Sequence, residues 1–385
     1  MTSRLFFFGR TPELSLFELQ VFAPQAVMLT DTIARVEEDV IVDGTVATDE
    51  TLMNLLGGTI KIASYCATVS ELNSTELVKW VRSADAEKRI TFGLSGYGVT
   101  ISIIKQLVAE IKDLFTSSHI SARFVLPQDG NVISAVAIEK DHVEELVLIK
   151  HEEEFIIGKT TCVQPFESWS RRDYDRPHAD PKSGMLPPKV ARMVVNIALG
   201  ADSRGKTLLD PFCGMGTILG EAMLRGVNTL GSDIDEEVVV KAKKNMSWII
   251  QEYDMKTNAR VFVSDASHVA QELGIVRIDA IATEPFMGTP RIGEGKITDP
   301  KEIANIVKGL DKLYIGCLKH WGLILKPGGV VVIAIPSFTV AGRVYSVKKA
   351  VDTCENLGYT KHLGPIVYGR PHAIVQRNFF VFIKN

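Results

Sequence analysis

The sequence has few cysteines, and they lie far apart. The five cysteines, Cys66, Cys162, Cys213, Cys317 and Cys354, form no C-x-x-C pair. Zinc sites and disulfide frameworks both depend on closely or regularly spaced cysteines. The sequence therefore predicts reduced thiols in the core, no disulfide framework and no metal site.

Long apolar runs are missing as well. The run near the N-terminus, Leu5 to Phe8, is far too short for a signal peptide or a membrane span, and no later stretch approaches the roughly 18 apolar residues that a span requires. We therefore expect a cytoplasmic protein with no membrane partner.

Excess charge of one sign is also absent. The net charge is −3 and the isoelectric point is near 6.3, so a nucleic-acid partner would have to meet a local basic patch. The length of 385 residues suits two domains, and a hydrophobic content of 46% with 23% charged residues is typical of folded proteins.

The most informative stretch is residues 207–226, where a short apolar run ends in Asp210-Pro211-Phe212-Cys213-Gly214-Met215-Gly216-Thr217. The pattern predicts a buried strand at 207–209, a glycine turn and a helix from about 217 to 225. Such a turn lets the backbone approach a ligand closely and directs N–H groups of the helix start at it. Asp210 would lie at the carboxyl end of the strand, where α/β sheets bind their ligands.

Two further acids follow predicted strands. Asp233 ends a strand 17 residues beyond Gly216, a distance that suits a hydrogen bond to a ribose diol. Asp235 fits the N-cap of the next helix. Asp265 follows a strand that starts at Arg260, and an aspartate in that position either contacts a ligand or simply begins a turn.

The spacing Asp-Pro-Phe-x-Gly-x-Gly-Thr resembles motif I of the S-adenosylmethionine (SAM) dependent methyltransferases, in particular those that methylate exocyclic amino groups of nucleobases. The resemblance implies SAM as cofactor, bound around Asp210, Pro211, Phe212, Gly214, Gly216 and Thr217. It also implies that Asp233 holds the ribose hydroxyls, that Asp265 meets the adenine amino group, and that Ala266 offers its N–H to the ring.

Thr283-Glu284-Pro285-Phe286-Met287-Gly288, after a predicted strand at 278–282, resembles motif IV of amino methyltransferases. That motif usually has Asp, Asn or Ser before Pro-Pro and an aromatic residue, so Glu284 is a departure. The chemistry needs an acceptor for the amino hydrogens and a flat face for the extruded base. The resemblance assigns acceptance to Glu284, orientation of the amine to the Pro285 carbonyl, and stacking to Phe286.

Residues 164–185 predict an ordered connector rich in proline, glycine and charge. Arg171, Arg172 and Arg176 either contact RNA phosphates or pair with neighbouring aspartates on a solvated face. The string from Arg176 through Leu186-Pro187-Pro188-Lys189 resembles the segment before motif I in tRNA guanosine N2-methyltransferases. By that resemblance Leu186 and Pro187 lie against the methionine end of SAM.

One motif is misleading. Residues 200–207 match the P-loop pattern G-x-x-x-x-G-K-T. A P-loop needs a strand before it and a helix after it, because the phosphates bind at the helix N-terminus. The predicted order here is the reverse, so a helix end and a strand start explain these residues.

The first 165 residues predict small mixed domains, which we divide into an α+β lobe at 1–88 and a second domain at 89–165. The second has predicted strands near 122–125, 132–138, 145–149 and 155–157. Residues 6–15, the stretch from Ser95 to Gly98, and 158–164 resemble the N-terminal half of THUMP-containing tRNA methyltransferases, in which this region binds tRNA. A structural or dimerising role is the alternative.

Two later cations are candidates for RNA contact. Arg291 lies in the glycine-rich loop after motif IV, which either closes over a substrate or is an ordinary loop. Arg370 lies between two predicted final strands, near 366–368 and 379–383, where a phosphate-binding wall and a solvated turn are equally open.

Together these patterns predict an α/β, Rossmann-like SAM-dependent methyltransferase domain at 186–385, joined through a connector at 166–185 to an α+β, THUMP-like RNA-binding region. The resemblance implies methyl transfer to the exocyclic N2 of a guanosine in tRNA, and it leaves open a small activating protein subunit and the oligomeric state. The alternatives are a DNA amino methyltransferase that acts on adenine N6 or cytosine N4, and a non-catalytic RNA-binding scaffold.

Overall fold

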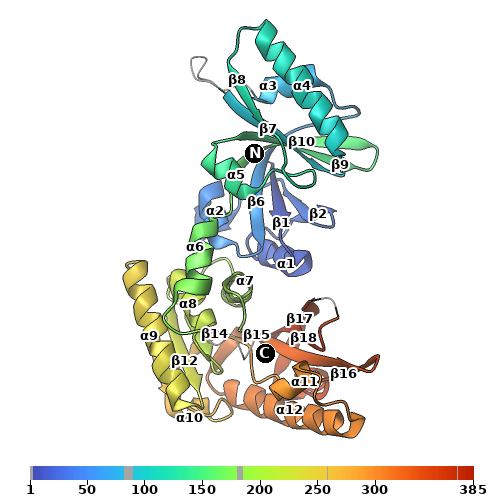
Figure 1. Cartoon of the computed structure of the whole chain (residues 1–385). Coiled ribbons are helices and arrows are strands. Elements are labelled where there is room, and N and C mark those ends of the chain that lie inside the picture. Colours follow the sequence, from blue (N-terminus) through green and yellow to red (C-terminus); the bar gives the residue numbers. More distant parts are fainter. Residues whose placement is uncertain (1–2, 82–89, 180–184, 258, 371) are drawn as a thin grey trace. The chain divides into compact units, whose positions relative to one another are not determined.

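The chain divides into two compact units in the computed structural model, residues 1–168 and 169–385 (Figure 1). The structure describes residues 3–81, 90–179, 185–257, 259–370 and 372–385. The predicted boundary between residues 88 and 89 lies outside the described residues, as do residues 180–184 of the predicted connector. The division after Ser168 lies close to the predicted end of the N-terminal region at residue 165.

A single eight-stranded mixed sheet organises the first unit, in the order β2-β3-β1-β6-β10-β9-β7-β8. β7 pairs in parallel with β8 and β9, and the other neighbours are antiparallel. Strands from both predicted N-terminal parts lie in this sheet. The strands are β1 (Arg4–Phe8), β2 (Val27–Thr30), β3 (Ile33–Val36), β6 (Thr59–Val69), β7 (Ile90–Tyr97), β8 (Ala122–Val125), β9 (Glu144–His151) and β10 (Glu154–Val163), with β4 (Ile41–Val42) and β5 (Thr45–Val46) as a separate pair.

The helices of the first unit are α1 (Pro12–Phe22), α2 (Asp49–Leu55), α3 (Ser74–Val81), α4 (Ile101–Ser117) and α5 (Ala135–Lys140). α4 buries one stripe, at Ile104, Leu107, Val108, Ile111 and Phe115, in a core with β7 and α3. Counted from Ile104 as position i, the others lie at i+3, i+4, i+7 and i+11, which is the spacing of one helical face.

The predicted strand at 132–138 is wrong, because this segment contains α5. Its short apolar run fits either structure, since periodicity alone does not separate a short strand from a short helix. The Ser134 hydroxyl accepts a hydrogen bond of 3.2 Å from the Ala137 N–H and so caps the helix. Such a cap favours the helical alternative.

A seven-stranded sheet forms the centre of the second unit, in the order β13-β12-β11-β14-β15-β18-β17. β18 is antiparallel to both of its neighbours, and the first five strands are mutually parallel. This confirms the predicted final hairpin. The strands are β11 (Thr207–Asp210), β12 (Asn228–Asp233), β13 (Ala259–Val263), β14 (Ile278–Thr283), β15 (Leu325–Val340), β17 (Tyr359–Tyr368) and β18 (Val375–Lys384), and β16 (Arg343–Ser346) pairs with the end of β15.

Helices cover the sheet of the second unit, with α7 and α12 on opposite faces (Figure 1). They are α7 (Pro188–Leu199), α8 (Thr217–Leu224), α9 (Glu236–Glu252), α10 (Val269–Leu273), α11 (Pro290–Gly293), α12 (Pro300–Trp321) and α13 (Lys349–Asp352), with a 3-10 turn at Glu355–Leu357. α6 (Phe166–Ser170) and a π-helical turn, Arg171–Asp175, precede them.

The largest core of the second unit joins α10 and α12 to the sheet. Tyr314, Cys317 and Trp321 of α12 are fully buried against Val331 and Ile333 of β15. Burying one large apolar side chain stabilises a fold by about 1.5–3 kcal/mol. The packing of α12 on β15 therefore stabilises this part of the sheet. Among the helices that the structure describes, none is long and apolar enough to cross a membrane.

Candidate active site

The glycine loop connects β11 to α8 as the sequence predicts. Gly214 and Gly216 have φ values of +51° and +82°, a region that L side chains rarely adopt. Gly216 is the N-cap of α8, and a Cβ atom built on it would lie 2.8 Å from Cε of Met246. A Cβ atom on Gly214 would meet open space. The loop therefore needs glycine at both positions for its backbone shape.

Asp210 joins this loop to the strand that leads into motif IV. Its Oδ1 accepts a hydrogen bond of 2.7 Å from the Thr283 hydroxyl, at the end of β14, and one of 3.1 Å from the Phe212 N–H. Burial raises the pKa of Asp210 to about 7, against the opposing effect of these two hydrogen bonds. Because the carboxylate points into the protein, Asp210 connects β11 and β14 at their carboxyl ends.

Asp233 lies beside the same loop, at the end of β12. Its Oδ2 accepts a hydrogen bond of 3.1 Å from the Gly214 N–H, and its Oδ1 accepts one of 3.0 Å from the Asp235 N–H. Asp235 caps α9 as predicted, because its Oδ1 accepts hydrogen bonds from the N–H groups of Glu237 and Val238. The structure thus brings Asp233, the residue predicted to bind the ribose hydroxyls, next to the glycine loop.

Asp265 and Ala266 follow β13 at the same edge of the sheet. Oδ1 of Asp265 accepts hydrogen bonds from the N–H and the hydroxyl of Ser267, at 2.8 and 2.7 Å, so this residue does begin a turn. The Ala266 carbonyl accepts a hydrogen bond of 3.0 Å from Nε1 of Trp321, and the Trp321 ring lies 6.5 Å from that of Phe212. Phe212, Trp321 and Ala266 therefore form one connected cluster beside the loop.

Leu186 and Pro187 enter α7, whose first residue is Pro188. Leu186 is buried, and Pro187 is the N-cap of the helix. Proline is favoured at a first helical position because the N–H that it lacks would have no intrahelical partner.

Motif IV begins directly after β14. Nε of Arg377, from β18, donates to Oε1 of Glu284 at 2.5 Å, and the two side chains are only 18% (Glu284) and 22% (Arg377) exposed. Burial raises the pKa of Glu284, and the guanidinium of Arg377 opposes that rise. The Glu284 carboxylate is therefore held from another strand rather than by its own loop.

Phe286 is presented to solvent. Its side chain is 55% exposed, while its carbonyl accepts a hydrogen bond of 2.7 Å from the hydroxyl of the buried Tyr314. An exposed aromatic face on a fixed backbone suits stacking with a flat ligand.

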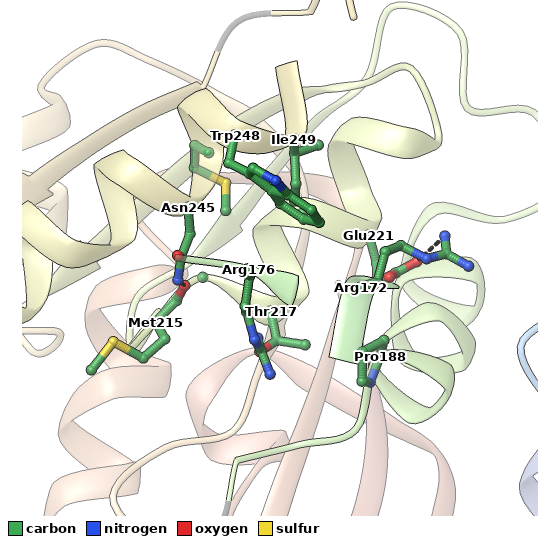
Figure 2. A pocket seen from close by; sticks show the side chains of 12 residues that line it. Arg172, Arg176, Pro188, Met215, Thr217, Glu221, Asn245, Trp248 and Ile249 are labelled. Carbon is green, nitrogen blue, oxygen red and sulfur yellow. Dashed lines mark hydrogen bonds and ion pairs between the residues drawn. The ribbon is translucent and has the colours of Figure 1, made fainter. Parts of the chain in front are cut away.

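Two of the three connector arginines, Arg172 and Arg176, are buried rather than exposed as the sequence suggests. Arg172 is 8% exposed and donates at 3.3 Å to Glu221 of α8 (Figure 2). Its guanidinium also covers the Trp169 ring at 3.8 Å, and Arg192 of α7 contacts Glu221 at 2.8 Å. Among the residues that the structure describes, Asp173 and Asp175 are not its hydrogen-bond partners. In this position Arg172 fastens the connector to two helices.

Arg176 is 9% exposed and donates at 2.7 Å to the hydroxyl of Thr217, at the start of α8. Next to it, Oδ1 of Asn245 accepts a hydrogen bond from the His178 N–H. Nδ2 of Asn245 donates to the carbonyls of His178 and Met215, and all three distances are 2.9 Å. The connector is thus attached directly to the glycine loop. Among these three connector arginines only Arg171 is exposed, and it pairs with Glu252 at 3.0 Å.

The pocket between the connector and α8 and α9 is small. Arg172, Arg176, Thr217, Asn245 and Trp248 help to line it, and its volume is about 20 Å³ (Figure 2). That is room for about one water molecule. We therefore assign it no nucleotide or cofactor.

Arg291 and Arg370 are both exposed, on α11 and just after β17. The segments that carry them lie close together, because a Cβ atom built on Gly295 would be 3.7 Å from Ile374. The P-loop-like segment behaves as predicted: α7 ends before it, β11 follows it, and Lys206 donates to the Leu199 carbonyl.

Three residues that sequence reasoning missed complete the site: Thr283, Tyr314 and Arg377. Each acts through a contact with a residue far away in the chain. Thr283 ends a predicted strand next to Glu284, which is the one local signal that marks it. Tyr314 reads as an ordinary core position, and Arg377 as one cation in a hairpin.

The fold and the arrangement at the carboxyl ends of its strands are those of the Rossmann-like SAM-dependent methyltransferase class. The crystal structure of TrmN from Thermus thermophilus superimposes on the whole chain, covering 100% of both proteins at a TM-score of 0.54 and 17% identity. At that identity the likeness concerns the fold. The family model described as "RMKL-like, methyltransferase domain" matches residues 176–296.

Curated relatives make the assignment more specific. The tRNA (guanine(10)-N2)-dimethyltransferase of Pyrococcus abyssi is 31% identical over 212 residues, which are 55% of this chain and 52% of that protein. A probable tRNA (guanine(10)-N2)-dimethyltransferase of Methanothermococcus thermolithotrophicus is 33% identical over 115 residues, 29% of this chain and 67% of that protein. The chain belongs to the family of these proteins. It spans about half the length of the first curated relatives that it matches.

Proposed function

We propose that this protein transfers a methyl group from SAM to the exocyclic N2 of a guanosine in tRNA. The observation that carries the proposal is the position of Glu284 and Phe286. They follow Thr283, whose hydroxyl donates a hydrogen bond to Asp210, the residue that precedes the glycine loop. A base acceptor and an aromatic face thus stand beside a loop suited to a nucleoside cofactor.

The side chains around the loop fit SAM. Asp233 offers carboxylate oxygens to a ribose diol next to Gly214, whose Cα faces open space. In this proposal Asp265 and Ala266 meet the adenine ring, Pro211, Phe212, Gly216 and Thr217 shape the loop, and Leu186 and Pro187 lie at the methionine end. Asp210 supports the loop from beneath. SAM supplies the methyl group on a positively charged sulfur.

The reaction then asks little covalent chemistry of the protein. Glu284 accepts a hydrogen bond from the amine, and the Pro285 carbonyl orients that amine. Phe286 stacks on the base that has left its helix. Holding the reacting atoms in line supplies most of the rate gain in such a reaction.

RNA contact in this proposal uses exposed cations. Arg171, Arg291 and Arg370 are placed to meet phosphates, since phosphate contacts position an RNA without reading its sequence. Arg172 and Arg176 serve instead by holding the connector against α8. The first unit is proposed to be the THUMP-like region that binds the body of the tRNA, and the protein to act in the cytoplasm, where its substrate is. A small activating subunit remains a prediction from the family resemblance.

Nucleoside mass spectrometry tests the proposal. The purified protein is incubated with SAM and either unmodified tRNA or duplex DNA. N2-methylguanosine from tRNA alone is the expected product. Methylated adenine or cytosine from DNA would move the protein to the DNA amino methyltransferases, and intact SAM binding without any product would favour a scaffold.

A further inference from the structure

Arg377 is the most unusual neighbour of motif IV. It lies on β18, opposite Pro336 of β15, and its side chain reaches across β15 to Glu284, the first residue after β14. A long, charged pair of this kind is not needed to build the sheet, because the backbone ladder already joins β14, β15 and β18. The pair therefore calls for a role at the site itself.

We propose that Arg377 is a positioning residue for Glu284, and that the Arg377–Glu284 pair selects guanine over adenine as the base to be methylated. The inference rests on the proposed function, since it names the feature of the substrate that this site recognises.

The geometry fixes both ends of the Glu-Pro-Phe segment. At one end, the Arg377 guanidinium holds Oε1 of Glu284 at 2.5 Å. At the other end, the Tyr314 hydroxyl holds the Phe286 carbonyl at 2.7 Å. Glutamate is one methylene longer than aspartate, so without such a tether its carboxylate would sample several rotamers. Arg377 restricts the carboxylate to one position.

The second carboxylate oxygen of Glu284 keeps acceptor capacity. Within the described part of the chain, Oε2 of Glu284 makes no hydrogen bond. An ionised carboxylate only accepts hydrogen bonds, and it has about four lone-pair positions on its two oxygens. The tethered side chain can therefore still accept two donors from a substrate.

Guanine matches this acceptor and adenine does not. Guanine presents N1–H and N2–H side by side, which are two neighbouring donors for one carboxylate. Adenine presents one amino donor beside N1, which is an acceptor, so its lone pair would face the carboxylate. A site that hydrogen-bonds a substrate donor strongly rejects an analogue that lacks it, because buried polar groups then stay unpaired.

The charge state of Glu284 depends on the groups that face it. These are Arg377 from β18, Asp210 from the end of β11 and Tyr314 from α12, with the Tyr368 ring of β17 lying 6.0 Å from the Arg377 guanidinium carbon. Burial raises the pKa of Glu284 and Arg377 lowers it. Without the guanidinium, Glu284 would take up a proton at a higher pH. The protonated carboxyl has less acceptor capacity than the carboxylate.

The chemical step balances with these groups. The N2 nitrogen forms a bond to the methyl carbon while the bond from that carbon to sulfur breaks, and its electron pair stays on the sulfur. One N2 proton passes to Glu284 Oε2 and then to water. Arg377 stays charged throughout, so it acts only by holding and polarising the acceptor.

The first test compares Arg377→Gln and Arg377→Lys with the unchanged protein, using methyl transfer to tRNA across pH 5.5–9. We expect the acidic limb of kcat for Arg377→Gln to move to higher pH by about one unit, which is a loss of about tenfold on that limb. The lysine variant should recover part of the shift, and SAM affinity should stay within about twofold. Arg343→Gln, a matched change at an exposed arginine of β16, should leave the limb in place. An unmoved limb in a folded Arg377→Gln protein would overturn the positioning role.

The second test uses tRNA that carries 2,6-diaminopurine at the methylated position, which mass spectrometry of ribonuclease fragments locates. This base keeps the 2-amino group but has no N1–H. We expect kcat/KM to fall at least about tenfold relative to guanosine, which is the loss of one charge-assisted hydrogen bond. Equal kcat/KM for the two bases would overturn the selection of guanine.

A third measurement separates this inference from the proposed function. A double-mutant cycle of Arg377→Gln and Glu284→Gln in thermal unfolding needs no methyl transfer. Non-additive shifts at pH 8 would support the pair, and additive shifts would overturn it. If the cycle shows the coupling but the wild-type protein methylates no tRNA, the proposed function is withdrawn, and with it the selection of guanine.

Discussion

The Thr283 hydroxyl donates a hydrogen bond of 2.7 Å to Oδ1 of Asp210, across 73 residues of sequence and between two neighbouring strands. Asp210 opens the glycine loop, and Thr283 precedes Glu284. The bond therefore links the segment proposed to hold the cofactor to the segment proposed to hold the base. A change on one side should be felt on the other.

Thr283→Val should test that link. Valine keeps the shape of threonine but removes the donor, so the buried Asp210 oxygen loses a partner at a cost of about 1–3 kcal/mol in the free energy of unfolding. We also expect weaker SAM binding, measured by calorimetry. Thr283→Ser keeps the hydroxyl and serves as control. If both variants bind SAM equally well, the bond does not connect the two segments.

The pKa of Asp210 predicts an unusual pH dependence of stability. Burial raises this pKa to about 7, whereas an unfolded aspartate titrates near 3.9. Between about pH 4 and pH 7 the folded protein therefore holds a proton that the unfolded chain releases. The contribution of this group to stability is present at low pH and is lost as the pH rises through about 7.

Asp210→Asn should remove that dependence, because the amide oxygen can still accept from Thr283 but does not titrate. We expect the wild-type free energy of unfolding to fall relative to the variant by on the order of 3 kcal/mol from pH 4.5 to pH 7.5. Urea unfolding without SAM at several pH values measures it. Parallel curves for the two proteins would contradict the prediction.

Glu221→Gln should destabilise the second unit. Glu221 lies between Arg172 and Arg192, and all three side chains are buried. Removal of its charge takes this carboxylate away from the buried guanidinium groups of Arg172 and Arg192, and breaking a buried pair in this way costs about 3–5 kcal/mol. Glu252→Gln, which breaks the more exposed pair with Arg171, should cost at most about 1 kcal/mol. Similar unfolding free energies for the two variants would show that the buried cluster does not hold the connector.

Phe286→Ala should impair activity and spare the fold. The side chain is 55% exposed, so its removal should change the melting temperature little. Stacking of a base on an aromatic ring is worth about 1–3 kcal/mol, which corresponds to a loss of about 5- to 150-fold in kcat/KM for tRNA. Phe286→Tyr keeps the flat face and should stay close to wild type. Full activity of the alanine variant would remove Phe286 from the site.

Much of the second unit follows from local pattern. The glycine loop, the acids at the ends of β12 and β13, and the helix that begins after Leu186-Pro187 are signalled within a few residues, because turns, caps and strand periods are short-range properties. The segment at 132–138 shows the limit of that reasoning. There, an apolar run fitted two structures, and a single serine cap accompanies the helix that formed.

The connector shows another limit. Arg172 and Arg176 look like surface cations in a charged stretch, yet both are buried. Their partners, Glu221 and Thr217, lie 49 and 41 residues away. Charge in a sequence does not reveal burial, because burial of a cation depends on a partner brought from elsewhere.

By itself, the sequence determined the class of fold, the place of the glycine loop and the place of residues 284–286 directly after a strand, since each depends on neighbours in the chain. The tertiary structure alone decided that Arg377 holds Glu284 and that Thr283 holds Asp210. Those contacts depend on which strands are neighbours and in what register, as in the pairing of Ile333 with both Thr283 and Phe380. Strand order and register are set by the packing of the whole sheet, so no local stretch of sequence contains them.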